Sequence, residues 1–122
     1  MPEAAIDIQL KKGVLGLCVL ALLARGNSYA YEIASRLAQA VGMGEGTIYP
    51  LMRRMQADGL VATYLEESPS GPPRKYYSLT EAGHASYAAQ RDEWRSFTDA
   101  VDSLIGSDDS TATAAAPAGE GT

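Results

Sequence analysis

The chain of 122 residues contains one cysteine, one histidine, one tryptophan and one phenylalanine. A single cysteine cannot form an intrachain disulfide, which is typical of proteins in a reducing compartment. Cys18 lies in the apolar segment GLCVLAL, so we interpret it as a small buried side chain in preference to a reactive thiol. His84 has no cluster of cysteines or acids at ligand spacing around it, so we expect no metal site and no cofactor.

Long hydrophobic runs are missing as well. Hydrophobic residues make up 46% of the chain, but no run approaches the roughly 18 apolar residues of a membrane span. The apolar stretch 14–23 is too short to cross a bilayer, and no small-residue cleavage site follows it as in a secretory signal. These absences predict a cytoplasmic protein with no membrane partner.

The chain also lacks the residue groups that enzymes use. No Ser-His-acid or paired-carboxylate arrangement stands out in the sequence. The glycines of GMGEG are not followed by the Lys-Ser/Thr of a phosphate-binding loop, and a predicted helix precedes them where such a loop needs a strand. We therefore expect no catalytic residues and no enzymatic activity.

Positive charge is scarce over the whole chain but not in its first two thirds. The net charge is −5, yet residues 1–79 carry eight Lys or Arg and seven Asp or Glu, a net of +1. Residues 80–122 carry two Arg and eight acids, a net of −6. Attraction to phosphates depends on local potential, so this distribution still permits a nucleic-acid partner for the first part.

Helical periodicity dominates the first sixty residues. A first helix is predicted over residues 8–25, and Gly26-Asn27 ends it. Its apolar positions at helical spacing are Leu10, Val14, Leu15, Leu17, Cys18, Ala21 and Leu22. Ser28 is the expected N-cap of a second helix over 29–41. This helix should bury Tyr31 or Ile33, together with Ala34, Leu37 and Val41.

A third helix is predicted from Gly44 or Glu45 to Asp58-Gly59, with Pro50 as a local conflict near its start. An apolar stripe should face the core, formed by Ile48, Leu51, Met52 and Met55. The remaining faces then carry Thr47, Tyr49, Arg53, Arg54 and Gln56. An arginine such as Arg53 can bond to a guanine edge or clamp a phosphate, while a solvated helix face is the plain alternative.

Two strands are predicted over 60–66 and 75–79, joined by a turn at SPSGPP. Arg74 and Lys75 follow this tip and can reach phosphates or the minor groove, or else serve as exposed charges that deter aggregation. Tyr76 and Tyr77 should point to opposite faces. Glu66 and Glu67 on the other arm reduce the positive charge of this hairpin.

Thr80 is the expected cap of a last helix that ends near Ile105. One face of this helix carries a mostly apolar stripe whose members follow each other at alternating intervals of four and three residues. They are Tyr87, Arg91, Trp94, Thr98, Val101 and Ile105, and Phe97 and Leu104 widen the stripe. A helix of this length needs a surface to pack on, either the first helix or a second copy of the chain. Residues 1–7 should be flexible, and residues 106–122 are small, polar and predicted to be disordered.

These elements predict a mainly α (α+β) fold, a winged helix-turn-helix over 8–79 with a two-stranded β-wing, followed by a C-terminal helix over 80–105. The sequence resembles the PadR family of bacterial transcriptional regulators. The resemblance lies in YAYEI at 29–33, GTIYPLMRRMQADGLV at 46–61 and RKYYSLTEAGH at 74–84. The single helix after the wing is similar to the small subfamily.

The resemblance implies a homodimer that binds a palindromic operator on double-stranded DNA, usually as a repressor. It also implies that the C-terminal helix crosses to the partner. Some small members bind planar aromatic compounds at the dimer interface, which lowers their DNA affinity, so the resemblance extends to a small aromatic effector. The DNA-binding residues expected from pattern and resemblance together are Tyr29, Thr47, Tyr49, Arg53, Arg54, Arg74 and Lys75.

For the effector, the resemblance implies a site at Trp94, because ligand-binding members of the small subfamily carry an indole at the matching place. Leu10 and Leu17 would line the same pocket. Arg91 departs from that pattern. It either favours an anionic ligand or closes the pocket by pairing with an acid such as Asp92 or Asp99 of the partner subunit. Trp94 is otherwise a packing residue of the dimer contact. Two rival functions stay open, a winged-helix interaction module that does not bind DNA and a protein that is mainly a small-molecule sensor.

Overall fold

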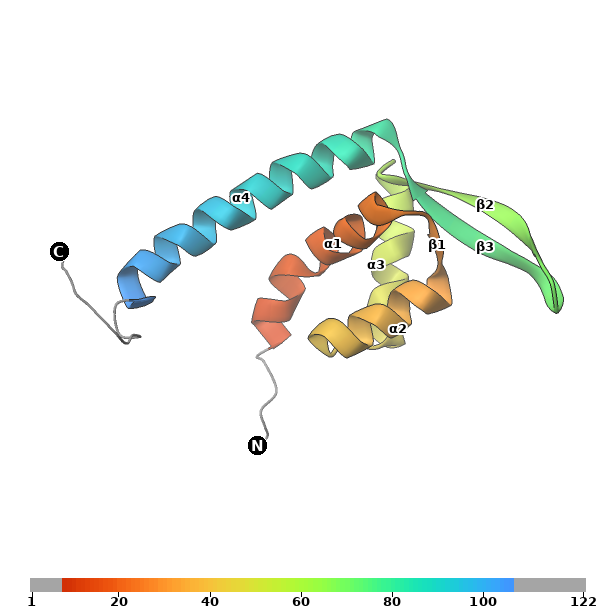
Figure 1. The fold of residues 1–122 in the computed structure, drawn as a ribbon, viewed down its shortest axis with the longest axis horizontal. Coiled ribbons are helices and arrows are strands. Elements are labelled where there is room, and N and C mark those ends of the chain that lie inside the picture. Colours follow the sequence, from red (N-terminus) through yellow and green to blue (C-terminus); the bar gives the residue numbers. More distant parts are fainter. Residues whose placement is uncertain (1–7, 107–122) are drawn as a thin grey trace. The chain divides into compact units, whose positions relative to one another are not determined.

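The computed structural model describes the backbone of residues 8–106 and the side chains of residues 13–106. The predictions for residues 1–7 and for the tail beyond Gly106 lie outside these described residues. The elements in chain order are α1 (Ile8–Arg25), β1 (Ser28–Tyr29), α2 (Ala30–Val41), α3 (Glu45–Ala57), β2 (Val61–Ser68), β3 (Gly71–Leu79) and α4 (Glu81–Ile105) (Figure 1). None of the described helices is long and apolar enough to cross a membrane.

The chain divides into two compact units inside α4, residues 1–88 and residues 89–122. In the first unit, α1, α2 and α3 pack together, and the β2–β3 hairpin projects away from them (Figure 1). This arrangement confirms the predicted winged helix-turn-helix. β3 ends at Leu79 and α4 begins at Glu81, so the division of the chain falls inside α4 and not at the end of the wing.

The sheet has three strands where two were predicted. Its order is β1-β3-β2, and both pairs are antiparallel. The added strand contains only Ser28 and Tyr29, which lie opposite Tyr77 and Tyr76. Two residues have no periodicity of their own, so only their pairing with a strand almost fifty residues away defines them as a strand.

The core of the first unit is built from all three of its helices and from the roots of the wing strands. Its buried apolar residues are Leu15, Val19, Leu20, Leu23, Ile33, Ala34, Leu37, Met43, Ile48, Met52, Met55, Val61 and Tyr77. Ile33, and not Tyr31, is the buried member of the pair left open by the sequence, because Tyr31 is 63% exposed. Val41 and Leu51 lie at the edge of the core, partly buried.

The buried face of α1 differs from the predicted stripe. The helix buries Leu15, Val19, Leu20 and Leu23, whereas Val14, Leu17 and Ala21 of the predicted stripe are only half-buried. Almost every position of the stretch 14–23 is apolar, so periodicity alone could not select the face. The half-buried apolar face of α1 is therefore available for a further contact.

The wing strands are longer than predicted. They reach Ser68 and Gly71, so Pro72 and Pro73 belong to β3 and not to a loop. The pairing is irregular between Glu66 and Ser68, opposite these prolines. Proline cannot donate to a ladder and is tolerated at such irregularities. The tight turn is confined to two residues, and the hairpin is a longer, stiffer arm than a flexible tip would make.

The start of α4 follows the predicted capping. The Thr80 hydroxyl accepts a hydrogen bond from the Gly83 N–H at 3.0 Å and donates one to the Gly59 carbonyl at 2.6 Å. The Thr80 N–H donates to the Leu60 carbonyl at 3.1 Å. This residue therefore caps α4 and ties it to the turn that follows α3, which places the wing and the first turns of α4 around a common anchor.

Candidate nucleic-acid interface

The outer face of α3 carries two arginines. Ile48, Met52 and Met55 are buried, so Arg53 and Arg54 lie on the exposed side of the helix. Among the residues that the structure describes, neither guanidinium has a hydrogen-bond or ion-pair partner. Two unpaired guanidinium groups on one helix face can donate to phosphate oxygens or to guanine edges without first breaking an ion pair.

Thr47 and Tyr49 are more buried than the sequence suggested. Both are half-buried, and Tyr49 packs against the core. The Thr47 N–H is not free for a phosphate, because it donates to the Gly44 carbonyl at 3.1 Å. Partial burial and the nearby Glu45 carboxylate raise the pKa of the Tyr49 phenol, which stays neutral and can donate a hydrogen bond.

Arg74 and Lys75 diverge to opposite faces of the wing. The Arg74 guanidinium carbon lies 4.4 Å from the ring centre of Tyr29, whereas the Lys75 ammonium lies 5.7 Å from the ring centre of Tyr77. Tyr29 is the N-cap residue of α2 in an extended conformation. One basic side chain of the wing is therefore held beside the start of α2, and the other lies on the face of the buried Tyr77.

Three tyrosines form a row across the sheet, and the sequence did not reveal it. Tyr29, Tyr76 and Tyr64 are direct cross-strand neighbours on β1, β3 and β2. The ring centres of Tyr29 and Tyr76 are 5.4 Å apart, and those of Tyr76 and Tyr64 are 5.7 Å apart in a stacked arrangement. The Asn27 amide donates to the Tyr64 hydroxyl at 3.0 Å and closes the far end of this tyrosine row.

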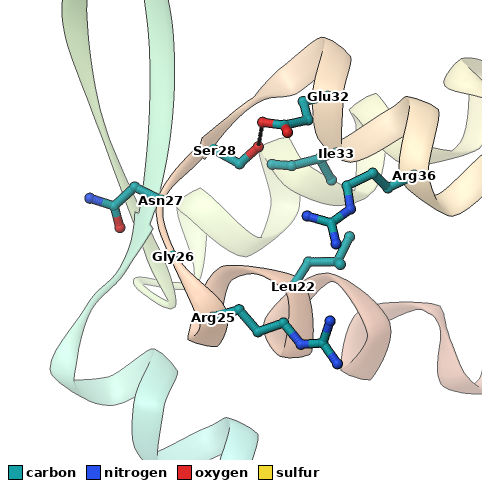
Figure 2. A pocket seen from close by; sticks show the side chains of 8 residues that line it. All are labelled: Leu22, Arg25, Gly26, Asn27, Ser28, Glu32, Ile33 and Arg36. Atoms are coloured by element: carbon teal, nitrogen blue, oxygen red, sulfur yellow. Dashed lines mark hydrogen bonds between the residues drawn. The ribbon is translucent and has the colours of Figure 1, made fainter.

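Ser28 is not the side-chain cap that was predicted for α2. The N-cap is Tyr29, which makes no side-chain capping bond, and the buried Ser28 hydroxyl donates to the Glu32 carboxylate at 2.6 Å. The alternation of β1 turns Ser28 inward while Asn27 points away, as Figure 2 shows. Behind Ser28 lies a hollow of about 120 Å³, lined by Leu22, Arg25, Gly26, Asn27, Ser28, Glu32, Ile33 and Arg36.

Tyr31 is a further exposed residue that pattern analysis left undecided. It lies in the first turn of α2 and is near enough to Tyr49 to act on its ionisation. A polar aromatic side chain beside α3 can donate to a phosphate, as Tyr29 can. The only signal in the sequence was the alternation in YAYEI, which offered two possible buried faces.

The residues expected at an effector site lie in both units. Leu17 is half-buried in α1 of the first unit, and the side chain of Leu10 lies outside the described part. In the second unit, Arg91 forms an ion pair with Asp92 of the same helix at 3.2 Å. Trp94, one turn further, is 42% exposed.

Two single residues have ordinary surroundings. Cys18 is half-buried, and this burial raises the pKa of its thiol, which favours the protonated form. His84 is exposed on the first turn of α4, and its backbone N–H donates to the Thr80 carbonyl. Among the side chains of residues 13–106, no three acids, cysteines or histidines form a group that could hold a metal ion.

Solved structures with the same fold carry related sequences. A PadR-like transcriptional regulator from Bacillus cereus is 34% identical, over 80% of this chain and 96% of that one, with a TM-score of 0.74. A PadR family regulator from Eggerthella lenta is 33% identical, over 82% and 88% of the two chains, with a TM-score of 0.70. PadR of Bacillus subtilis, solved in complex with operator DNA, shares the fold at 23% identity, over 63% and 46%, with a TM-score of 0.57.

The sequence profile described as "Transcriptional regulator PadR-like family" matches residues 19–89. This range includes α2, α3 and the whole wing, and it therefore contains every residue of the candidate interface. Members of the family are transcriptional regulators and not enzymes, in agreement with the absence of a catalytic arrangement in the sequence. The chain belongs to the PadR-like family of transcriptional regulators.

Proposed function

We propose that this protein is a DNA-binding transcriptional regulator that acts in the cytoplasm as a homodimer, with α3 as its recognition helix. The observation that carries the proposal is the pair Arg53 and Arg54, exposed and unpaired among the described residues on the outer face of α3. The α2 start with Tyr29 and the wing with Arg74 lie in the same unit. A relative of the same fold is known in complex with operator DNA.

In this proposal α3 enters the major groove, and Arg53 and Arg54 bond to guanine edges or phosphates there. Tyr29, Thr47, Tyr49, Arg74 and Lys75 supply the remaining contacts, mostly to the backbone. Two copies related by a twofold axis would place their α3 helices about 34 Å apart, one turn of the duplex, on a palindromic site. Binding at a nearby promoter excludes polymerase, so the expected outcome is repression.

The direct test is a gel shift with the DNA upstream of the protein's own gene. We expect Arg53→Ala plus Arg54→Ala to weaken binding by at least about 100-fold per subunit pair, since hydrogen bonds to charged groups contribute about 1.5–3 kcal/mol each. A control with the same change in charge is Arg36→Ala plus Arg95→Ala, because both residues are exposed and lie on α2 and α4.

The control should retain most of the affinity of the wild type. Binding that survives the Arg53 and Arg54 substitutions contradicts the proposed face. If the wild type binds no duplex even at low salt, where phosphate attraction is strongest, the proposed function is wrong and an interaction module without DNA binding takes its place.

We also propose that a small planar aromatic compound binds near Trp94 and lowers DNA affinity. The support is the indole of Trp94, which is exposed on the second unit. The Arg91–Asp92 pair lies within one helix, so an anionic ligand would have to compete with Asp92 for the guanidinium. Uncharged aromatic compounds avoid this competition and are the preferred class.

Trp94 is the only tryptophan, so its fluorescence reports this site alone. We expect a panel of planar aromatic compounds to contain members that quench the emission with saturation and shift the dimer away from DNA. Charged and neutral members of each ring type should be compared, with the neutral ones binding more tightly. If no compound of a broad panel quenches with saturation, Trp94 is a packing residue and regulation by an effector at this position is wrong.

A further inference from the structure

The sequence left two targets for Arg74, a phosphate or the minor groove. The geometry points to the first: we propose that the tyrosine row (Tyr29, Tyr76, Tyr64) with Asn27 is a positioning device. It holds the Arg74 guanidinium at the start of α2, so that Arg74 binds a backbone phosphate beside the recognition helix. This inference deepens the proposed function and rests on it, since it concerns the same DNA interface.

The register of the sheet sets this position. Tyr29 pairs with Tyr76, and β1 ends at Tyr29 because α2 begins with Ala30. Arg74 is two residues before Tyr76 on β3, so its side chain projects from the same face, level with the first turn of α2. Because β1 does not continue beyond Tyr29, the Arg74 side chain can occupy the space beside β3 at this level. Its guanidinium carbon lies 4.4 Å from the centre of the Tyr29 ring.

Arg74 has a competing partner and does not use it. Glu66 is its direct cross-strand neighbour on β2, at the distance where opposite charges attract. No ion pair between them occurs among the described residues, and the guanidinium lies over Tyr29 on the other side of β3. The contact with the Tyr29 ring occupies no N–H group with a protein acceptor, so the guanidinium remains able to donate to a phosphate.

The tyrosine row stabilises the position of the Tyr29 ring. Aromatic neighbours at 5.4 and 5.7 Å connect all three strands at the root of the wing, and the Asn27–Tyr64 hydrogen bond connects the last ring back to the segment before β1. Cross-strand aromatic pairs are among the contacts that stiffen a sheet. Tyr76 and Tyr64 therefore act on DNA binding through Arg74, whereas Tyr29 both holds Arg74 and is itself one of the proposed contacts. Of the three, only Tyr29 was expected to contact DNA itself.

The minor-groove target fits less well. Reading that groove needs an arginine that extends beyond the wing, whereas Arg74 folds back over β1. The other basic residue, Lys75, lies on the opposite face near Tyr77. A phosphate contact carries no base information, so its loss must weaken binding equally for every sequence.

The test uses the full-length protein and a duplex that the wild type selects from a random-sequence library. Two versions of this duplex carry A·T or G·C pairs in the flanks, where a wing would reach the minor groove. Binding is measured by fluorescence anisotropy over a range of salt concentrations. The variants are Arg74→Ala, Tyr76→Leu, Tyr76→Phe and the double variant Arg74→Ala plus Tyr76→Leu. Leu65→Ala, on the other face of β2 and 71% exposed, is the matched control.

We expect Arg74→Ala to weaken binding about tenfold on both duplexes and to lower the salt slope by about one per subunit. Tyr76→Leu should do the same to a smaller degree, and the double variant should be no weaker than Arg74→Ala alone. Tyr76→Phe keeps the ring and should behave as the wild type, as should Leu65→Ala. A purely structural role of Tyr76 would not lower the salt slope. Tyr64→Leu gives a second measurement should Tyr76→Leu unfold.

Three results overturn the inference while leaving the proposed function intact. They are additive effects of Arg74→Ala and Tyr76→Leu, a loss confined to the duplex with A·T flanks, and an unchanged salt slope in Arg74→Ala. If the library selection enriches no duplex for the wild type, the proposed function fails, and this inference fails with it.

Discussion

Gly83 leaves no room for a larger side chain. A Cβ built on it would lie 2.0 Å from the Leu60 carbonyl oxygen, which also accepts the Thr80 N–H. Backbone atoms on both sides of this contact are fixed, on one side by the cap of α4 and on the other by the end of α3. The close approach of α4 to Leu60 therefore requires a glycine at this position.

We expect Gly83→Ala to lower the free energy of unfolding by about 1–3 kcal/mol, the usual cost of forcing atoms into a packed site. A loss of stability would be the reverse of the usual effect, because alanine in place of glycine inside a helix ordinarily adds about 1 kcal/mol of stability. Urea denaturation followed by circular dichroism at one protein concentration measures the change. Gly13→Ala is the matched control, since a Cβ at Gly13 in α1 meets nothing within 4 Å.

The control should be neutral or slightly stabilising. A Gly83→Ala protein as stable as the wild type would mean that α4 can shift away from Leu60 without loss, and the contact would then not anchor this helix.

At the scale of elements, local signals were sufficient where one face of a helix is clearly polar. The bounds of α3 follow from apolar spacing, as do Ala34 and Leu37 among the buried residues of α2, whereas the choice between Tyr31 and Ile33 does not. Thr80 marks the start of α4 through a cap that needs only three following residues. In α1 the spacing failed, because an almost wholly apolar helix offers several equivalent faces. Packing against α2 and β3 makes that choice, and it is a long-range effect.

The candidate interface likewise contains residues that follow from a local pattern and residues that depend on long-range contacts. The exposure of Arg53 and Arg54 could be predicted from the helix pattern of α3 alone. The tyrosine row could not, because it depends on the register between strands whose residues are far apart in sequence. A shift of one residue in that register would turn Tyr76 into the core and Tyr77 outward. The position of Arg74, and with it the difference between a phosphate contact and a groove contact, is therefore a property of the sheet.

For the whole molecule, the second unit presents large apolar side chains along α4. Phe97 is 62% exposed and Leu104 is 83% exposed, and they lie one heptad apart on one face of the helix. Burial of each such side chain contributes about 1.5–3 kcal/mol, and a twofold interface counts each of them twice. A second copy of the chain is the partner that we propose for this stripe, as the homodimer requires.

We expect Phe97→Asp plus Leu104→Asp to convert the dimer into a monomer in size-exclusion chromatography with light scattering. The matched control is Ser96→Asp plus Ser103→Asp. It adds the same two charges at exposed positions one residue earlier, on a neighbouring face of α4.

The monomer should also bind a palindromic duplex far more weakly, because two linked half-sites gain affinity from their high effective concentration. Its affinity for a single half-site should be unchanged, since Arg53, Arg54 and Arg74 all lie in the first unit. A double variant that remains dimeric, or a wild type that is already monomeric, contradicts the twofold arrangement on which the operator spacing depends.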